Sequence, residues 1–199
     1  DGDEIIPAKE VLYLAEFFRD RGERQRAVHF LNRLFQWHPE PGEFEWQRIS
    51  GVVESILAAE PTQPQLCLGL GRLCLRLGKM DRAIQEFILA TADPDLQQAA
   101  NRALAESYAL TGQYSLSLEK YRNVKLTAED IQAIYKMIDP LEKSGADSDV
   151  IQALRLISEV DPAYMDVAQR IAKGERQSSP SISLPSADPK MRALIGDLA

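Results

Sequence analysis

The segment from Pro64 to Leu96 reads PQLCLGLGRLCLRLGKMDRAIQEFILATADPDL, and the rest of the chain is arranged around it. Apolar residues recur at helical spacing on both sides of Gly78, which predicts two antiparallel helices joined by a tight turn at that glycine. Small residues stand where two helices must approach closely and larger ones fill the remaining space, at Leu70, Gly71, Ala83, Phe87 and Ala90. This order of small and large side chains predicts one unit of a helical-repeat protein.

Three further glycines repeat the spacing of this unit. Gly112 follows Gly78 by 34 residues, and Gly145 follows Gly112 by 33. Gly22 precedes Gly78 by 56 residues, which is one period of 34 plus 22 extra residues. The sequence therefore predicts four helix pairs, interrupted once, at about 8–41, 64–97, 98–131 and 131–162.

The remaining segments are predicted from their composition and apolar spacing. Residues 43–60 form an inserted helix, because five apolar residues share one helical face: Trp46, Ile49, Val53, Ile56 and Leu57. Residues 162–173 form a helix that caps the last open face of the array. Residues 1–7 are an acidic lead-in, and residues 174–199 combine a Ser/Pro-rich linker with a short amphipathic tail.

These units resemble the tetratricopeptide (TPR) repeat family over about Ala8–Ala172. The unit around Gly78 matches the family pattern well, the next unit moderately, and the two outer units by register. The resemblance implies an all-α fold, a right-handed α-solenoid of about four helix pairs. The inserted helix departs from a regular array of such repeats, and a C-terminal capping helix and a flexible tail complete the predicted architecture. The resemblance also implies that peptides or subunits bind to the inner surface of the superhelix.

One subgroup of this family grips the terminal carboxylate of a peptide with lysine and asparagine at fixed positions. In this chain the lysine position holds Leu12 in the first unit and Leu68 in the unit around Gly78. The asparagine position holds Glu16 and Arg72. The chain therefore resembles the repeats that are not of the chaperone-clamp type. Its closing stretch, DPAYMDVAQRI, looks like that of bacterial TPR modules attached to other domains.

Composition and charge restrict the function classes. Apolar residues make up 45% of the 199 residues, and 23 Lys and Arg against 30 Asp and Glu give a formal net charge of −7. This balance argues against general binding of nucleic acid or anionic membranes. No apolar run approaches the length of a membrane-spanning helix. Two cysteines, Cys67 and Cys74, are predicted to be buried free thiols, which favours a cytoplasmic location. The chain begins at Asp1, so we expect a fragment of a longer protein.

The sequence offers no recognisable catalytic, metal or cofactor motif. His29 and His38 are its only histidines, and it has no HExxH pattern, nucleophile elbow or glycine-rich phosphate loop. The glycines of LGLGRL stand within a predicted helix, so they are interpreted as packing residues. We expect a protein that is not an enzyme and needs neither metal nor cofactor. A buried histidine beside a carboxylate would favour a catalytic helical domain instead.

The resemblance implies a binding surface formed by the first helix of each pair. Its inward positions are Gln65, Leu68, Arg72, Leu75 and Arg76, then Arg102, Glu106 and Ala109, and finally Gln132, Tyr135, Asp139 and Lys143. Five of these are the candidate partner-binding residues: Arg72, Arg76, Arg102, Glu106 and Tyr135. The three arginines suit an acidic or carboxylate ligand, because guanidinium binds carboxylate in a bidentate manner. The alternative is a set of solvated arginines that pair with Glu106 or with other nearby acids.

The tail provides a second candidate surface. Its apolar residues recur at helical spacing, at Met191, Leu194, Ile195 and Leu198. A helix of about 11 residues is too short to be stable alone. The tail is therefore predicted to dock onto its own groove, a neighbouring copy or a partner, and the alternative is simple disorder.

These features favour a non-catalytic protein–protein interaction scaffold or adaptor in a bacterial multiprotein assembly. The alternative is a regulatory or sensory TPR segment of a larger signalling enzyme. Either would bind a protein or peptide partner and no nucleic acid, and a homo-oligomer formed through the inserted helix or the end repeats stays open.

Overall fold

The computed structural model describes residues 6–59 and 63–178, with side chains described as far as Ala172. Within these ranges the chain is all-helical and contains no strand. The helices are α1 (Ala8–Asp20), α2 (Arg24–Trp37), α3 (Glu43–Leu57), α4 (Pro64–Arg76), α5 (Met80–Ala90), α6 (Gln97–Leu110), α7 (Tyr114–Tyr121), α8 (Ala128–Ser144), α9 (Asp147–Val160) and α10 (Val167–Ser178).

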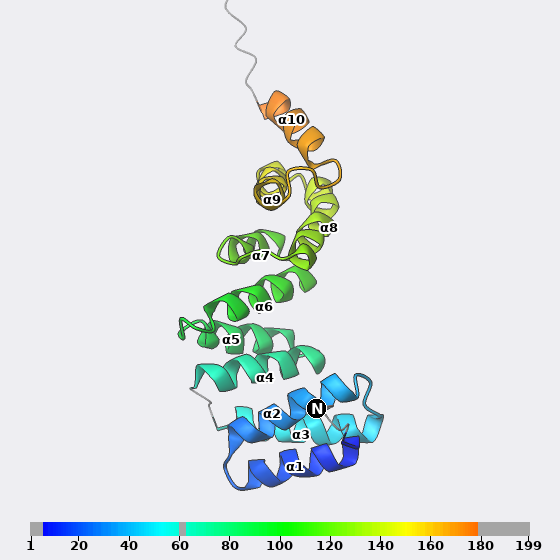
Figure 1. Ribbon diagram of the computed structural model, residues 1–199, viewed down its shortest axis with the longest axis vertical. Coiled ribbons are helices and arrows are strands. Elements are labelled where there is room, and N and C mark those ends of the chain that lie inside the picture. Colours follow the sequence, from blue (N-terminus) through cyan, green and yellow to red (C-terminus); the bar gives the residue numbers. More distant parts are fainter. Residues whose placement is uncertain (1–5, 60–62, 179–199) are drawn as a thin grey trace, which may run out of the picture.

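The helices stack into an elongated α-solenoid (Figure 1). The pairs α1/α2, α4/α5, α6/α7 and α8/α9 are helical hairpins, and α3 is inserted between the first two pairs. Neighbouring pairs join through α2 against α4 and α5 against α6, and α10 packs on α9 at the far end. The predicted fold class, an all-α TPR-like solenoid of four helix pairs with one inserted helix, is confirmed.

Each hairpin turns at a glycine, in a backbone conformation that only a residue without a side chain adopts easily. Gly22, Gly78, Gly112 and Gly145 have φ angles of 75°, 70°, 74° and 74°, in the left-handed region. At the turn after α4, the Gly78 N–H donates to the Leu75 carbonyl at 3.0 Å, and the Lys79 N–H donates to the Cys74 carbonyl at 2.8 Å. These two bonds form a Schellman motif, which satisfies the last carbonyls of the helix. The repeat spacing of the glycines thus reflects one recurring helix end.

Two glycines inside α4 allow the neighbouring helices to approach closely. A Cβ atom on Gly71 would lie 2.5 Å from the Phe87 ring of α5, and one on Gly69 would lie 2.6 Å from Cγ1 of Val28 in α2. Any larger residue would force these helices apart. The interpretation of the LGLGRL glycines as packing residues is therefore confirmed.

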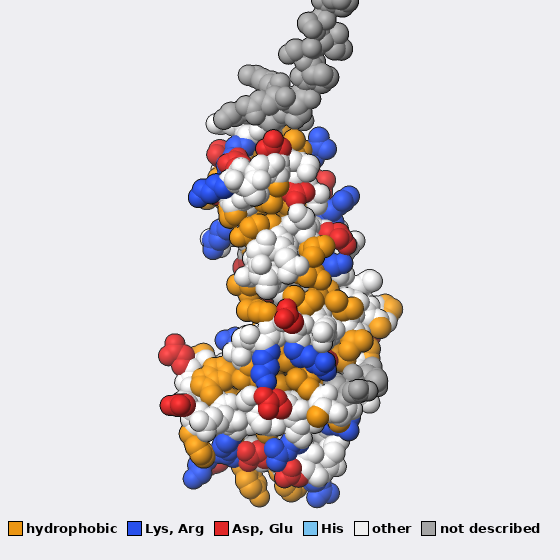
Figure 2. Space-filling view, turned by 180° about the vertical axis from the view of Figure 1, so that it is seen from behind, with side chains coloured by type: hydrophobic (Ala, Val, Ile, Leu, Met, Phe, Trp, Pro, Cys, Tyr) orange, Lys and Arg blue, Asp and Glu red, His pale blue; other side chains and the backbone are white. Residues whose placement is uncertain are grey.

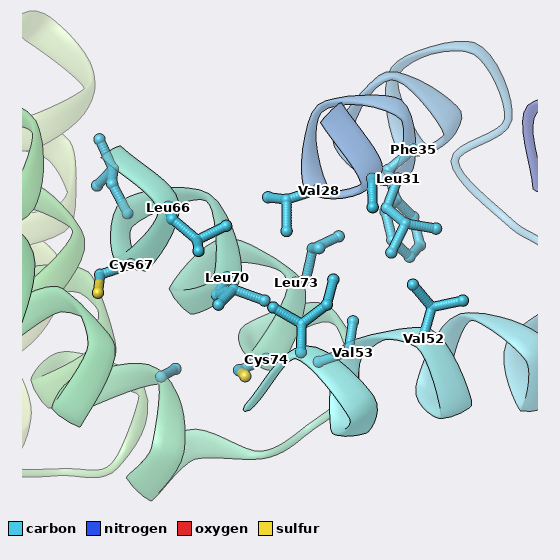
Figure 3. Packing of buried hydrophobic residues seen from close by; sticks show 14 of the residues in the cluster. Val28, Leu31, Phe35, Val52, Val53, Leu66, Cys67, Leu70, Leu73 and Cys74 are labelled. Atoms are coloured by element: carbon cyan, nitrogen blue, oxygen red, sulfur yellow. The ribbon is translucent and has the colours of Figure 1, made fainter. Parts of the chain in front are cut away.

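The inserted helix α3 closes the first hairpin against the rest of the stack. It packs against α1 and α2 and touches α4. Figure 3 shows side chains of α2, α3 and α4, among them Val28, Val53 and Leu73, meeting in one apolar cluster. Trp46 of α3 lies against Phe35 of α2, with ring centroids 5.3 Å apart. The predicted apolar face of residues 43–60 is thus the face that α3 buries, although the described helix ends at Leu57.

The apolar interior divides within α6. Leu104 belongs to the cluster that reaches back to α1, and Ala105 belongs to a second cluster that continues through α8 and α9. At the end of this second part, α10 begins at Val167, five residues later than the predicted start of the 162–173 helix, and continues to Ser178. A turn precedes it, because the Asp161 side chain accepts from the Ala163 N–H at 3.1 Å and Met165 has a φ of 45°.

The predicted tail lies outside the described residues. This includes the four apolar positions proposed to dock: Met191, Leu194, Ile195 and Leu198.

Candidate binding surface

A groove of about 640 Å³ follows the junction of α2 and α4, and we call it the α2–α4 groove. Its lining residues come from one face of each helix: Gln25, Arg26, Val28, His29, Asn32, Arg33, Gln36, Gln65, Leu66, Leu68, Gly69 and Arg72. None of them is acidic. Three inward positions predicted from the sequence, Gln65, Leu68 and Arg72, are among them. Positively charged side chains gather near the middle of the face shown in Figure 2, at about the height of α4 in Figure 1.

The floor of the α2–α4 groove is fixed by a close helix contact. Gly69 leaves room for Val28, and the Asn32 amide donates to the carbonyls of Val28 at 3.0 Å and Gly69 at 3.3 Å. This amide joins the two helices, because one of its acceptors is in α2 and the other in α4. The groove is therefore a preformed feature of the packing.

The charged side chains of the groove differ in how they are held. Arg26 pairs with Glu23 at 2.8 Å and lies over the Phe18 ring at 5.3 Å. Arg33 lies 4.6 Å from the centroid of the Trp37 ring. Arg72 is exposed, and among the described residues it has no ion pair or hydrogen bond. Its guanidinium is thus the most available for a ligand.

Two other predicted arginines lie outside the groove lining. Arg76 is exposed and lies 5.6 Å from the centroid of the Phe35 ring. Arg102 is held by its own chain: Nε donates to both Asp130 oxygens at 3.1 and 3.0 Å, and Nη2 donates to the Lys125 carbonyl at 2.8 Å. This pairing follows the alternative that the sequence left open, in which an arginine pairs with a nearby acid.

Glu106 is near both Arg72 and Arg102. Its carboxylate is exposed, but the surrounding helices displace part of its water, and this desolvation raises its pKa. The charge of Asp130 raises the pKa further, whereas Arg102 and Arg72 oppose the change. The charges of Arg72 and Arg102 therefore both act on the carboxylate of Glu106.

Tyr135 lies in a different part of the solenoid. Its hydroxyl donates to Asp166 at 2.8 Å, and this bond is the main cause of its raised pKa. Its ring meets Tyr164 edge-on at 5.6 Å, and Arg170 lies 6.0 Å from its centroid. These contacts place Tyr135 where α8 meets the turn before α10 and Arg170 of α10. The structure does not bring it to the predicted arginines, Arg72, Arg76 and Arg102.

The sequence did not identify the α2 side of the groove. Gln25, His29, Asn32 and Gln36 recur at helical spacing as a polar stripe. This polar stripe could have indicated a second wall of the groove, but the second helix of the pair was interpreted from its apolar face alone. Its position opposite Gln65 and Arg72 depends on the packing of α2 against α4.

The side chains that the structure describes include two cysteines but no metal-binding cluster. They contain no group of three or more His, Cys, Asp or Glu side chains that could hold a metal ion. Cys67 and Cys74 are buried and form no disulfide, as predicted. Burial first, then the nearby Glu86, raises the pKa of Cys67 to about 12 and that of Cys74 to about 11. Both thiols therefore stay protonated and unreactive at neutral pH.

Among the described helices, none is both long and apolar enough to cross a membrane.

The helix pairs and the glycine turns together define a helical-repeat protein of the α-solenoid class. No known protein-family model matches the chain, and no curated protein matches its sequence. The solved structures that are similar to this chain include the following two. One is the crystal structure of MamA protein, with 14% identity over 85% of this chain and 81% of that chain and a TM-score of 0.45. The other is that of PilW, a widely conserved type IV pilus biogenesis factor, with 16% identity, 86% and 87% coverage and a TM-score of 0.42.

Proposed function

We propose that this chain is a non-catalytic TPR protein that serves as an interaction scaffold, binding a peptide or subunit of a multiprotein assembly along its solenoid. The observation that supports this function is the α2–α4 groove, which is preformed, polar and bordered by the available guanidinium of Arg72. A groove that runs along two helices suits a segment of another polypeptide.

The chemistry of the groove also supports binding over catalysis. His29 is the one lining residue that could act as a general base, and it is exposed, with no carboxylate, hydroxyl or thiol side chain lining the groove beside it. His38, half-buried, has its Nε2 2.9 Å from the Ile6 carbonyl. The buried pairing of histidine with carboxylate that would favour a catalytic domain is thus missing from the described residues.

Site-specific photo-crosslinking tests this function. A photoreactive residue is introduced at Gln36, which lines the groove, and at Gln47, a matched exposed glutamine of α3 outside it. In cells that produce the protein naturally, Gln36 should yield a discrete crosslinked protein that Gln47 does not. If neither position, nor others along the groove such as Gln65, captures a protein, the scaffold function is overturned.

A further inference from the structure

The α2–α4 groove has a charge opposite to that of the whole protein. The formal net charge of the chain is −7, yet the lining contains Arg26, Arg33 and Arg72, together with His29, and no acidic side chain. A cleft lined by one sign of charge concentrates ligands of the other sign. The groove therefore attracts a negatively charged partner, whereas the net negative charge of the whole protein repels one.

The position of Arg72 gives this selection a definite contact. Arg26 already pairs with Glu23, and Arg33 lies over Trp37. Arg72 has no ion pair among the described residues, and an exposed guanidinium can donate two parallel hydrogen bonds to one carboxylate. An incoming carboxylate at Arg72 would displace water and no protein partner.

The other lining residues suit an extended polypeptide. Amide side chains, which both donate and accept hydrogen bonds, are spaced along both walls, at Gln25, Asn32, Gln36 and Gln65. Leu68 and Val28 supply apolar floor between them. From Gln25 to Gln36 the helix rises about 16 Å, which is the length of about five extended residues.

We infer that the α2–α4 groove binds an acidic segment of about five extended residues in a partner protein, with a carboxylate of that segment on Arg72 and its apolar side chains on the groove floor. This inference rests on the proposed scaffold function and specifies the partner. Single-stranded nucleic acid fits less well, because no phenylalanine, tyrosine or tryptophan side chain lines the groove to stack on bases.

The test uses a defined probe and the whole chain. The probe is an acetylated and amidated six-residue peptide that alternates glutamate with leucine. Matched peptides replace glutamate with glutamine or with lysine. Amide chemical shifts of the labelled protein are followed during titration, at low and at high salt. We expect the glutamate peptide to shift the amides of Asn32, Gly69 and Arg72, to bind at least tenfold more tightly than the glutamine peptide, and to weaken as salt rises.

Variants at Arg72 separate this contact from general attraction. Arg72→Gln should weaken binding of the glutamate peptide about tenfold, and Arg72→Lys by less, since it keeps the charge but loses the bidentate geometry. The matched control is Arg155→Gln on α9, which is also exposed, has no ion pair among the described residues and should leave the affinity unchanged.

Four results would overturn the inference: equal affinity for the glutamate and glutamine peptides, shift changes confined to α8–α10, tighter binding of an oligothymidine of equal length, or self-association of the chain that Arg72→Gln abolishes. Crosslinking at Gln36 keeps the two proposals apart. If Gln36 captures a protein but the acidic peptide does not bind, the scaffold function stands and the acidic partner is wrong. If neither Gln36 nor the other groove positions, such as Gln65, captures a protein either, both are wrong.

Discussion

The contact between α4 and α5 and the contact between α6 and α8 join neighbouring helices by different chemistry. In the first, the fully buried ring of Phe87 occupies the space that a side chain at Gly71 would need. In the second, Arg102 of α6 pairs with Asp130 of α8, whose side chain is only 4% exposed. The first contact depends on shape alone, whereas the second depends on the ionisation of two side chains.

This difference predicts that the two parts of the solenoid respond to different changes. A close apolar contact is lost when volume changes. A polar junction is lost when one partner is removed, because the other is then left desolvated without its counter-charge. Since the apolar interior also divides within α6, the part from α8 onward is expected to open more easily than α4 and α5.

The largest effect is expected from Phe87→Ala. Removing a fully buried ring leaves a cavity, and the free energy of unfolding should fall by about 3–5 kcal/mol. Denaturation by urea measures this change. The control is Phe44→Ala, because Phe44 is 67% exposed and its loss should cost no more than about 0.5 kcal/mol. Equal effects of the two substitutions would contradict the packing described for α4 and α5.

The next effect is expected from Arg102→Met. It leaves the buried carboxylate of Asp130 without a counter-charge, although the N–H of Thr127 still donates to it at 2.8 Å. We expect a loss of about 2 kcal/mol, with faster amide hydrogen exchange in α8 and α9 and little change in α4 and α5. Arg102→Met combined with Asp130→Asn should restore part of the loss. Uniformly faster exchange in all helices would show that the two parts are one cooperative unit.

The contrast between these two contacts also shows what the sequence could reveal. Gly71, Phe87 and the turn glycines follow a repeating order, so the helix pairs and the inserted helix were predictable from local pattern. Arg102 is different, because its partner Asp130 lies 28 residues away and is brought to it by the packing of α6 on the loop before α8. Its pairing was therefore only one of two alternatives.

The candidate site was half predictable for the same reason. Arg72 and Gln65 follow from the repeat register, whereas His29 and Asn32 join them only because α2 packs on α4. The apolar spacing predicted a helix from residue 162, but α10 begins at Val167. The carboxylate of Asp161 accepts from the Ala163 N–H and stabilises a turn in the residues before the helix. Local pattern does not report which of two competing hydrogen-bond arrangements prevails.

A smaller effect, dependent on pH, is expected from Glu16→Gln in the N-terminal part. Arg48 of α3 donates two hydrogen bonds to Glu16 of α1, at 2.8 and 2.6 Å, and this hydrogen bonding lowers the pKa of Glu16 from its ordinary value. A lowered pKa stabilises the fold above the unfolded-state pKa, and this stabilisation is lost as pH falls through the folded-state value. Glu16→Gln should thus cost about 0.5–1 kcal/mol at neutral pH, since the pair is partly exposed, and nothing in strong acid. A cost independent of pH would show that shape, not charge, matters there.

The smallest effect on stability has the opposite sign and is expected near the contact between α6 and α8. The pKa of Glu106 is raised, first by desolvation and then by Asp130, so its contribution to stability is present below the unfolded-state pKa and lost as pH rises through the folded-state value. At neutral pH the charged carboxylate is therefore unfavourable. Glu106→Gln should stabilise the protein, by no more than a few tenths of a kcal/mol because solvent screens an exposed group, and the gain should vanish in acid. Thermal unfolding of both proteins across this pH range measures the difference.

A loss of stability at neutral pH would mean that the attraction of Glu106 to Arg72 and Arg102 exceeds the desolvation of its carboxylate. The junction would then be held by a network of opposite charges that reaches the α2–α4 groove.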